Sequence, residues 1–234
     1  SLEMSKKFIS SYEDVVLFSC PLDKSLLLSG LQISSGQTEY YEKFSGKSAL
    51  MLMHSPQLKV GLVTNHLSLQ RVPKEISKEL IIKKLEIFYD FLQKVLNIKE
   101  PRIAVCGLNP HCGDNGLFGF EDQESIRPAI ELFMRKRNCS NVNGPLPADT
   151  VFWHALKKEY DGVLAMYHDQ GLAPIKTISF LETINISAGL PFLRVSPAHG
   201  PASNLFLKNK ANISSYVETM KFALSHLCTT VESR

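Results

Sequence analysis

The sequence has 234 residues, of which 44% are hydrophobic and 21% charged, so the chain can bury a sizeable globular core. The formal net charge is only +3, and acidic and basic residues are interspersed, which argues against a nucleic-acid partner. No stretch of about 18 uninterrupted apolar residues occurs, so we expect no membrane contact. The five cysteines form no CxxC pair, which favours a reducing, cytoplasmic setting.

Predicted strands and helices alternate through the first half of the chain. The apolar residues between Pro73 and Ile98 recur at helical spacing, with proline near the first turn, and predict the longest helix. Short runs of β-branched and aromatic residues predict strands before it. These strands cover residues 14–20, 49–53 and 59–64, and an amphipathic segment covers residues 40–45.

The same alternation continues in the second half. A strand over residues 102–106 runs into a loop rich in glycine, asparagine and aspartate that ends at Gly116. Pro128, inside a helix predicted over residues 122–136, indicates a later start or a kink. The remaining predictions are a loop over 143–150, a helix capped by Asp149 or Thr150 and ending at Lys158, strands over 161–167 and 193–196, turns at Gly171 and His199–Gly200, and a helix over 214–227. This order predicts an α/β fold with a mostly parallel sheet and flanking helices.

Three histidines, His66, His111 and His168, each follow a predicted strand. The carboxyl ends of parallel strands meet at the edge of the sheet where ligands bind. Neutral imidazole suits zinc and related divalent ions, and three protein ligands leave positions open for a substrate. A single histidine of this kind is more often a hydrogen-bonded structural residue, but the shared setting of all three favours a metal site.

A second group comprises Lys176, Asn185 and Arg194, which follow His168 at even intervals. Two cations and an amide can hold a substrate that carries a carboxylate or phosphate, because arginine provides a bidentate fork and lysine a point charge. The alternative is three unrelated, solvated side chains. Spacing alone leaves both interpretations open.

Four motifs carry a resemblance to a known family: Asn-Pro-His-Cys-Gly-Asp at 109–114, Asn-Gly-Pro-Leu-Pro-Ala-Asp-Thr at 143–150, Met-Tyr-His-Asp-Gln-Gly at 166–171 and Gly-Leu-Pro-Phe-Leu-Arg at 189–194. In this order they resemble the 4-hydroxythreonine-4-phosphate dehydrogenase family. The resemblance implies an isocitrate/isopropylmalate dehydrogenase-like fold with two lobes around a cleft. Residues 1–36 and 188–234 would form part of the cofactor-side lobe, and residues 37–187 the lobe for metal, substrate and dimerisation.

The resemblance also implies roles for individual residues. A divalent metal ion, zinc, magnesium or cobalt, would be held by His66, His111 and His168. Substrate would be bound by Gln37, Thr38, Lys176, Asn185 and Arg194. Lys176 would transfer a proton, while Asp149 and Asp169 would orient the histidines or the lysine. The cofactor, NAD or NADP, would contact His199, Gly200 and Asn212.

The implied reaction is the NAD(P)-dependent oxidation and decarboxylation of 4-phosphohydroxy-L-threonine to 3-amino-2-oxopropyl phosphate, a step of vitamin B6 (pyridoxal phosphate) biosynthesis. The implied enzyme is a cytoplasmic homodimer whose active site draws on both subunits. Gln37 stands where the family has a histidine, and Phe206-Leu207 where it has smaller residues near the cofactor. Two alternatives follow: a dehydrogenase of another phosphorylated hydroxy acid, such as a four-carbon sugar acid 4-phosphate, or a non-catalytic fragment that binds a metal and a phospho-ligand.

Overall fold

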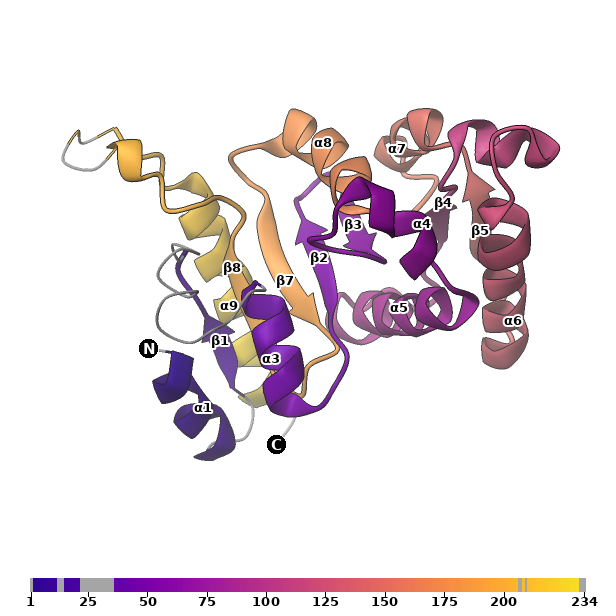
Figure 1. The fold of residues 1–234 in the computed structure, drawn as a ribbon. Helices are drawn as coiled ribbons and strands as arrows, with labels where there is room; N and C mark the ends of the chain where they lie inside the picture. Colours follow the sequence, from indigo (N-terminus) through magenta and orange to yellow (C-terminus); the bar gives the residue numbers. More distant parts are fainter. Residues whose placement is uncertain (1, 12–14, 22–35, 206–207, 209, 232–234) are drawn as a thin grey trace.

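The computed structural model describes residues 2–11, 15–21, 36–205, 208 and 210–231 (Figure 1). Within these residues, one eight-stranded sheet has the order β1-β8-β7-β2-β3-β6-β4-β5. The strands are β1 (Val16–Phe18), β2 (Leu50–His54), β3 (Lys59–Leu62), β4 (Ile103–Cys106), β5 (Val142–Leu146), β6 (Gly162–Ala165), β7 (Ile184–Ala188) and β8 (Leu193–Pro197). Four of its ladders are parallel, and the three antiparallel ladders each include β2 or β7. The prediction of an α/β fold with a mostly parallel sheet is confirmed.

Helices cover both faces of this sheet (Figure 1). The helices α5 (Lys78–Asp90), α6 (Arg127–Arg137) and α9 (Ser214–Val231) supply one hydrophobic core, and α7 (Ala148–Leu156) and α8 (His168–Ser179) supply the other. Side chains alternate between the two cores along the central strands β2, β4 and β6. In β4, Ile103 and Val105 belong to the first core, whereas Ala104 and Cys106 belong to the second. Burial on both faces explains why the central strands read as continuous apolar runs.

A third, small hydrophobic cluster lies beside β1. It joins the N-terminal helix α1 (Leu2–Ser11) to α3 (Gln37–Ser45) through the buried side chains of Leu2, Tyr41 and Phe192. The rings of Tyr41 and Phe192 meet edge to face with centroids 5.7 Å apart. This cluster fixes α3 against the end of the sheet that carries β8.

The long helix predicted from Pro73 to Ile98 is interrupted. Ile76 has an extended backbone that ends α4 (Val72–Glu75), and Ser77 then caps α5 by accepting a hydrogen bond from the Leu80 amide. Serine favours a cap over a helix interior because its hydroxyl replaces the missing helical partner of an amide. A π-helical turn, Phe91–Val95, follows α5.

The position of Pro128 agrees with the predicted later start. A π-helical turn, Asp122–Ile126, precedes α6, and Pro128 lies in the first turn of α6. The proline lacks an amide hydrogen, but the amides of a first helical turn have no helical partner in any case.

Two predictions for residues 143–158 are wrong. The predicted loop contains β5, an edge strand paired with β4, and an edge strand tolerates Pro145 because one side of its backbone needs no sheet partner. Pro147, rather than Asp149 or Thr150, occupies the N-cap of α7, which ends at Leu156. Glycine and proline suggested a loop, and the pairing with β4 overrode that local signal.

The turn predicted at Gly171 is also wrong, because Gly171 and Lys176 both lie within α8. A Cβ atom at position 171 would lie 2.7 Å from Leu62 Cδ2 and 2.8 Å from Val60 Cγ1. Glycine is therefore needed for α8 to pack closely on β3. The strand β7 was not predicted, although the three consecutive residues Ile186 to Ala188 are buried.

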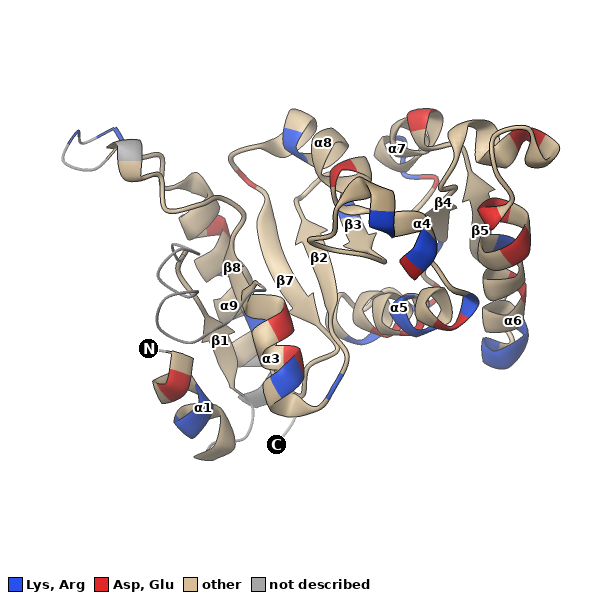
Figure 2. Cartoon of the chain, in the orientation of Figure 1, with Lys and Arg blue, Asp and Glu red and all other residues tan. Residues whose placement is uncertain are grey.

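Charged side chains of both signs are interspersed on α3, α5 and α6 (Figure 2). Helices with mixed charge on their outer faces are typical of solvated surfaces. Across the described ranges, no helix is both long enough and apolar enough to cross a lipid bilayer.

The burial of His54 makes stability depend on pH. Burial lowers the pKa of His54, at the end of β2, to about 4, with smaller contributions from Lys59 and His226. The unfolded chain, with a histidine pKa of about 6.5, binds more protons than the folded chain between these values. Stability is therefore complete above pH 6.5 and is lost as pH falls towards 4.

We expect the free energy of urea unfolding to fall by about 2 kcal/mol between pH 7 and pH 5 through this residue. The His54→Phe variant should lose that part of the pH dependence. His154→Phe, at an exposed histidine paired with Glu159, should retain it. An equal pH dependence in wild type and His54→Phe would contradict the assignment.

Candidate active site

A pocket of about 330 Å³ lies where β2, β7, β8 and the segments that follow β1 and β3 meet the N-termini of α3 and α8. Its lining contains seven of the residues to which sequence analysis gave a role in binding metal or substrate, and two of those assigned to the cofactor. These are Gln37, Thr38, His66, His168, Lys176, Asn185 and Arg194, together with His199 and Gly200. Seven separate chain segments converge here, as expected for a ligand site at the ends of sheet strands.

Arg194 in β8 is the most deeply buried charged group of the pocket, with 2% of its surface exposed. Its guanidinium donates to Ser19 Oγ from Nε (3.0 Å) and Nη2 (2.7 Å), to Gln37 Oε1 from Nη2 (2.8 Å) and to Ser187 Oγ from Nη1 (3.3 Å). Burial lowers the pKa of Arg194 to about 10, so it remains a cation at neutral pH. Its hydrogen-bond partners among the described residues are neutral, and its charge is available to an anionic ligand.

The N-terminus of α3 adds to this anion-binding character. Gly36 is its N-cap, and Gln37 and Thr38 are its first two residues. The first amides of a helix have no helical acceptor and carry the positive end of the helix dipole. Because all three residues line the pocket, a phosphate or carboxylate there would meet both the helix end and Arg194.

Polar groups of β7 complete this wall. Ser187 Oγ lies 2.9 Å from Thr38 Oγ1, and both residues are buried. Asn185, two residues earlier and therefore on the same face of the strand, has a buried Oδ1 without a hydrogen-bond partner in the structure. A buried amide oxygen of this kind is suited to accept a hydrogen bond from a ligand hydroxyl.

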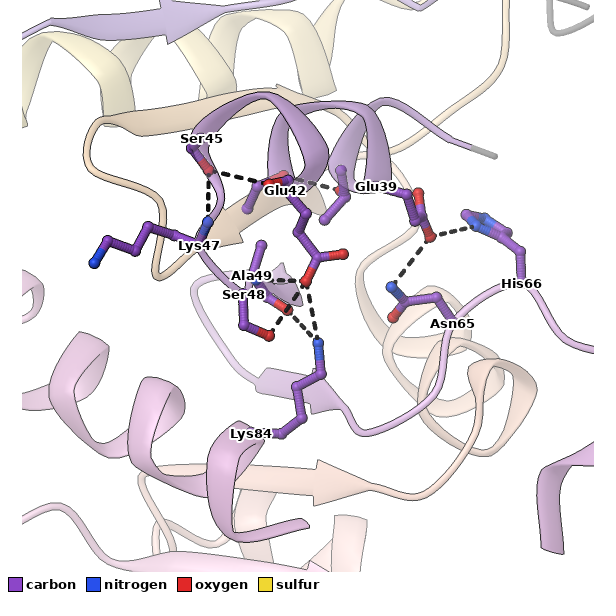
Figure 3. Close-up of polar contacts among 11 residues, drawn as sticks. Glu39, Glu42, Ser45, Lys47, Ser48, Ala49, Asn65, His66 and Lys84 are labelled. Atoms are coloured by element: carbon purple, nitrogen blue, oxygen red, sulfur yellow. Dashed lines mark hydrogen bonds and ion pairs between the residues drawn. The ribbon is translucent and has the colours of Figure 1, made fainter. Parts of the chain in front are cut away.

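His66 and His168 lie together, with ring centroids 5.4 Å apart. His168 Nδ1 is 2.7 Å from Asp169 Oδ1, and His66 Nδ1 is 3.3 Å from Glu39 Oε1 (Figure 3). An ionised carboxylate only accepts hydrogen bonds, so each neutral imidazole donates from Nδ1 and keeps its lone pair on Nε2. This carboxylate–histidine pairing is typical of metal ligands.

Glu39 remains ionised in this setting. Burial opposes its ionisation, but hydrogen bonds from His66, its own backbone amide and Asn65, together with the positive charge that His66 carries when protonated, outweigh burial and lower the pKa of Glu39 to about 2. Asn65 Nδ2 donates to Glu39 Oε1 at 3.2 Å. Sequence analysis missed Glu39; its position two residues after Gln37, in the first turn of a helix, was the available signal.

His111 is not part of the pocket. It is exposed and lies in a segment, Pro110–Gly116, in which five consecutive residues have positive φ, from 41° to 81°. Such a backbone costs about 1–2 kcal/mol for each non-glycine residue, so other contacts must hold it. Within the described part of the chain, no group of three or more metal-ligating side chains is gathered in one place.

Asp149 also lies outside the pocket and is exposed. Burial is the main cause that raises the pKa of the Cys112 thiol to about 11, and the negative charge of Asp149 contributes. Asp149 therefore lies near the loop that carries Cys112 and His111. Sequence analysis assigned Asp149 to the same site as Lys176 and the three histidines. Within a single chain, however, Asp149 lies near the loop that carries His111 and away from Lys176, His66 and His168.

Lys176 lines the pocket from α8 and is half-buried. Its Nζ lies 5.9 Å from the ring centroid of Phe180, one helical turn further along. Because a lysine side chain is long and flexible, Nζ can reach a ligand in the pocket from this position.

A second, largely apolar pocket of about 930 Å³ adjoins the first and shares Ala198, His199 and Gly200 with it. Asn212 also lines it, so the three residues assigned to the cofactor lie around one cavity. Phe180, Leu181 and Leu205 provide apolar lining. Residues 206, 207 and 209, where the sequence departs from the family, lie outside the described residues.

A buried ion pair anchors α3 to the rest of the fold (Figure 3). Glu42 Oε1 accepts hydrogen bonds from the Ala49 amide (2.6 Å) and Ser48 Oγ (3.3 Å), and lies 3.7 Å from Lys84 Nζ. Lys84, in α5, also donates to the Ala49 carbonyl. These contacts join α3, the start of β2 and α5, and so fix the helix that carries Gln37, Thr38 and Glu39.

Comparison with known proteins identifies the family. The family described as "Pyridoxal phosphate biosynthetic protein PdxA" matches residues 1–223. The chain belongs to this family. It is 39% identical over 210 residues to a 4-hydroxythreonine-4-phosphate dehydrogenase of Roseobacter denitrificans, covering 88% of this chain and 64% of that protein. It is 37% identical over 224 residues to the enzyme of the same name from Sulfurihydrogenibium, covering 95% and 68%.

Solved structures of the same family have the same fold. The 4-hydroxythreonine-4-phosphate dehydrogenase of Klebsiella pneumoniae matches with a TM-score of 0.79 and 36% identity, over 91% of this chain and 64% of that one. The enzyme from Burkholderia phymatum matches with a TM-score of 0.78 and 35% identity, over 97% and 68%. The chain thus spans roughly two thirds of the length of these relatives.

The buried charge of Arg194, whose hydrogen-bond partners among the described residues are neutral, gives a first test of the site. Arg194→Met removes a buried cation at similar volume, so without anions we expect a free energy of unfolding within about 1 kcal/mol of wild type, or higher. Inorganic phosphate should raise the melting temperature of wild type and not of this variant. Differential scanning fluorimetry with and without phosphate measures both effects.

Arg102→Met is the matched control, because Arg102 forms an ion pair with Asp161 and neither residue lines the pocket. It should keep the phosphate-induced rise in melting temperature. Retention of that rise in Arg194→Met would refute the anion site.

Proposed function

We propose that this chain carries out the NAD(P)-dependent oxidation and decarboxylation of 4-phosphohydroxy-L-threonine to 3-amino-2-oxopropyl phosphate in pyridoxal phosphate biosynthesis. The observation that carries the proposal is Arg194, a buried arginine without an acidic partner among the described residues, in a pocket lined by His66, His168 and Lys176. The relatives named 4-hydroxythreonine-4-phosphate dehydrogenase support this substrate.

The substrate would be held by its charged groups. Arg194 and the N-terminus of α3 would bind one anionic group, phosphate or carboxylate, while Lys176 faces the same pocket with a second cation. Asn185 Oδ1 would accept a hydrogen bond from the substrate. Gln37, whose Oε1 accepts from Arg194, has its amide Nε2 on the Cys20 carbonyl (3.3 Å), so it orients the guanidinium.

The donor set fits one divalent metal ion, and we propose zinc, magnesium or cobalt. His66 and His168 would bind it through Nε2, because Glu39 and Asp169 engage their Nδ1 atoms. Such an ion supplies Lewis-acid stabilisation of negative charge on a substrate oxygen. We assign His111 as the third ligand, contributed to the site of a partner subunit.

The surface around His111 is suited to a homodimer interface. Three large apolar side chains near it in sequence are exposed: Leu117, Phe118 and Phe120. Trp153 of α7 is exposed as well. Clusters of exposed apolar side chains mark interaction surfaces. A dimer that covered them would bring His111, and Asp149 beside its loop, towards the partner's pocket.

The reaction needs a hydride acceptor and a proton acceptor. A nicotinamide cofactor, NAD or NADP, accepts the hydride from the secondary alcohol. Lys176 would take the hydroxyl proton and, after carbon dioxide leaves, return a proton to carbon. Arg194 would hold the substrate in place through both steps, and Asp169 would keep His168 in the orientation required for binding.

The finer architecture follows from this function. We propose an isocitrate/isopropylmalate dehydrogenase-like arrangement of two lobes around a cleft, with residues 1–36 and 188–234 on the cofactor side and 37–187 on the metal and dimerisation side. The apolar pocket lined by His199, Gly200 and Asn212 supports a dinucleotide there. We assign the enzyme to the cytoplasm.

Lys176→Ala provides the test of turnover. With 4-phosphohydroxy-L-threonine, wild type should form NADH or NADPH, followed by absorbance at the nicotinamide band, and Lys176→Ala should lose activity by a hundredfold or more, on the order of general acid–base catalysis. Lys94→Ala, at an exposed lysine paired with Asp90, is the control and should keep full activity. A panel with four-carbon sugar acid 4-phosphates examines the alternative substrate. Absence of turnover with every substrate, in protein that binds metal and phosphate, would favour the non-catalytic alternative.

Mixing two inactive variants tests the shared metal site. His66→Ala and His111→Ala should each lose bound metal as homodimers. In a mixed dimer, one site combines intact residues of both chains, so an equal mixture should recover about one quarter of the wild-type metal content. Elemental analysis after dialysis measures it. No recovery, despite exchange of subunits, would count against a site completed by His111 of the partner.

A further inference from the structure

The segment that carries His111 has a backbone that its own residues do not favour. His111, Cys112, Asp114 and Asn115 all have positive φ, between 41° and 56°, and only Gly113 among these five is free of the steric penalty. Non-glycine residues persist in this conformation only when surrounding contacts determine it. The contacts that stabilise this backbone therefore also determine the position of His111.

The principal contact is a fully buried carboxylate, Asp122, which begins the π-helical turn before α6. Asp122 Oδ1 accepts from the Leu108 amide at 2.8 Å. Asp122 Oδ2 accepts from the Asn109 amide at 3.1 Å and from Asn109 Nδ2 at 2.9 Å. One buried side chain thus engages three donors in the two residues that immediately precede Pro110 and His111.

Neighbouring groups reinforce this arrangement. Asn109 Nδ2 also donates to Glu121 Oε2 at 2.8 Å, so both of its hydrogens have acceptors. A Cβ atom on Gly113 would lie 2.5 Å from the Gly119 carbonyl oxygen, so the loop is closed tightly against the segment that leads to Asp122. A carboxylate with no exposed surface is costly to bury unless such donors satisfy it.

We infer that Asp122 is a positioning residue for His111: it holds the Leu108–Asn109 backbone and thereby sets the direction in which the His111 imidazole leaves the loop. This inference rests on the proposed role of His111 as a metal ligand. Asp122 touches neither metal nor substrate, and it acts only through the backbone of the loop. Preorganisation of a ligand raises metal affinity because less conformational freedom is lost on binding.

Asp122→Asn is the test variant, since it keeps the volume but replaces one acceptor oxygen by a donor. The probe is Co²⁺ alone, whose visible absorption reports both binding and the ligand set. We expect the affinity for Co²⁺ to fall by about tenfold to a hundredfold, as for loss of other residues that orient ligands. Amide hydrogen exchange of residues 108–116 in the metal-free protein should also become faster.

A double-mutant cycle separates positioning from general destabilisation. His111→Ala should lower Co²⁺ affinity by itself, and adding Asp122→Asn to it should produce no further fall, because the residue through which Asp122 acts is gone. A further fall of similar size in the His111→Ala background would overturn the inference. So would an unchanged Co²⁺ affinity in Asp122→Asn.

Asp161→Asn is a matched control, because Asp161 holds the backbone before β4 as Asp122 holds the backbone after it. Asp161 accepts from Arg102 N (2.9 Å), Nε (3.1 Å) and Nη2 (3.0 Å). It should lower the melting temperature without changing Co²⁺ affinity. A fall in Co²⁺ affinity with this control equal to that of Asp122→Asn would also overturn the inference.

If Asp122→Asn does not fold, Asn109→Ser provides the same information. It removes the side-chain donor but keeps both backbone hydrogen bonds to Asp122, so a smaller fall in Co²⁺ affinity is expected, again absent in the His111→Ala background. An unchanged affinity in Asn109→Ser would then decide against the inference. His111→Ala without any effect on Co²⁺ binding would instead contradict the proposed metal ligand, which distinguishes the two failures.

Discussion

The burial of the Arg194 guanidinium is the constraint on which the site depends. A cation in the protein interior requires hydrogen-bond acceptors, and here they come from Ser19 after β1, Ser187 in β7 and Gln37 in α3. None of these acceptors carries a charge, and the negative charge of Glu39 only partly offsets the effect of burial on the guanidinium. The ends of β1 and β7 and the start of α3 are thereby gathered around a position prepared for an anion.

The orientation of α3 depends on a second buried cation that is neutralised. Burial lowers the pKa of Lys84, whereas the adjacent charge of Glu42 favours the protonated form. The pair links α3 to α5 and to the start of β2, one helical turn after Glu39, which lines the pocket (Figure 3). One buried cation forms an ion pair that holds a helix, whereas the other has only neutral hydrogen-bond partners among the described residues and lines the pocket.

Much of this arrangement could be predicted from the sequence. Apolar runs in the sequence identified β2, β3, β4 and β6. His66 and His168 could be recognised because the change from apolar to polar residues at the end of a strand can be read from neighbouring positions in the sequence. Local propensity misjudged β5, where Pro145 suggested a loop, and α8, where Gly171 suggested a turn. Both depend on contacts distant in sequence, namely pairing with β4 and close packing on β3.

The sequence did not predict the side chains that orient other residues of the site. Glu39 and Asp122 belong to segments whose polar residues could equally face solvent, and only the folded chain brings Glu39 to His66 or Asp122 to the Asn109 amide. The separation of His111 from the pocket could not be deduced from strand ends either. Gln170 accepts from the Met166 amide (2.7 Å) and donates to the Gly107 carbonyl (2.8 Å), joining the base of the His111 loop to the helix that starts at His168. If His111 completes the site of a partner subunit as proposed, the ligands that one subunit gives to two different sites share a single hydrogen-bonded support, the Gln170 side chain.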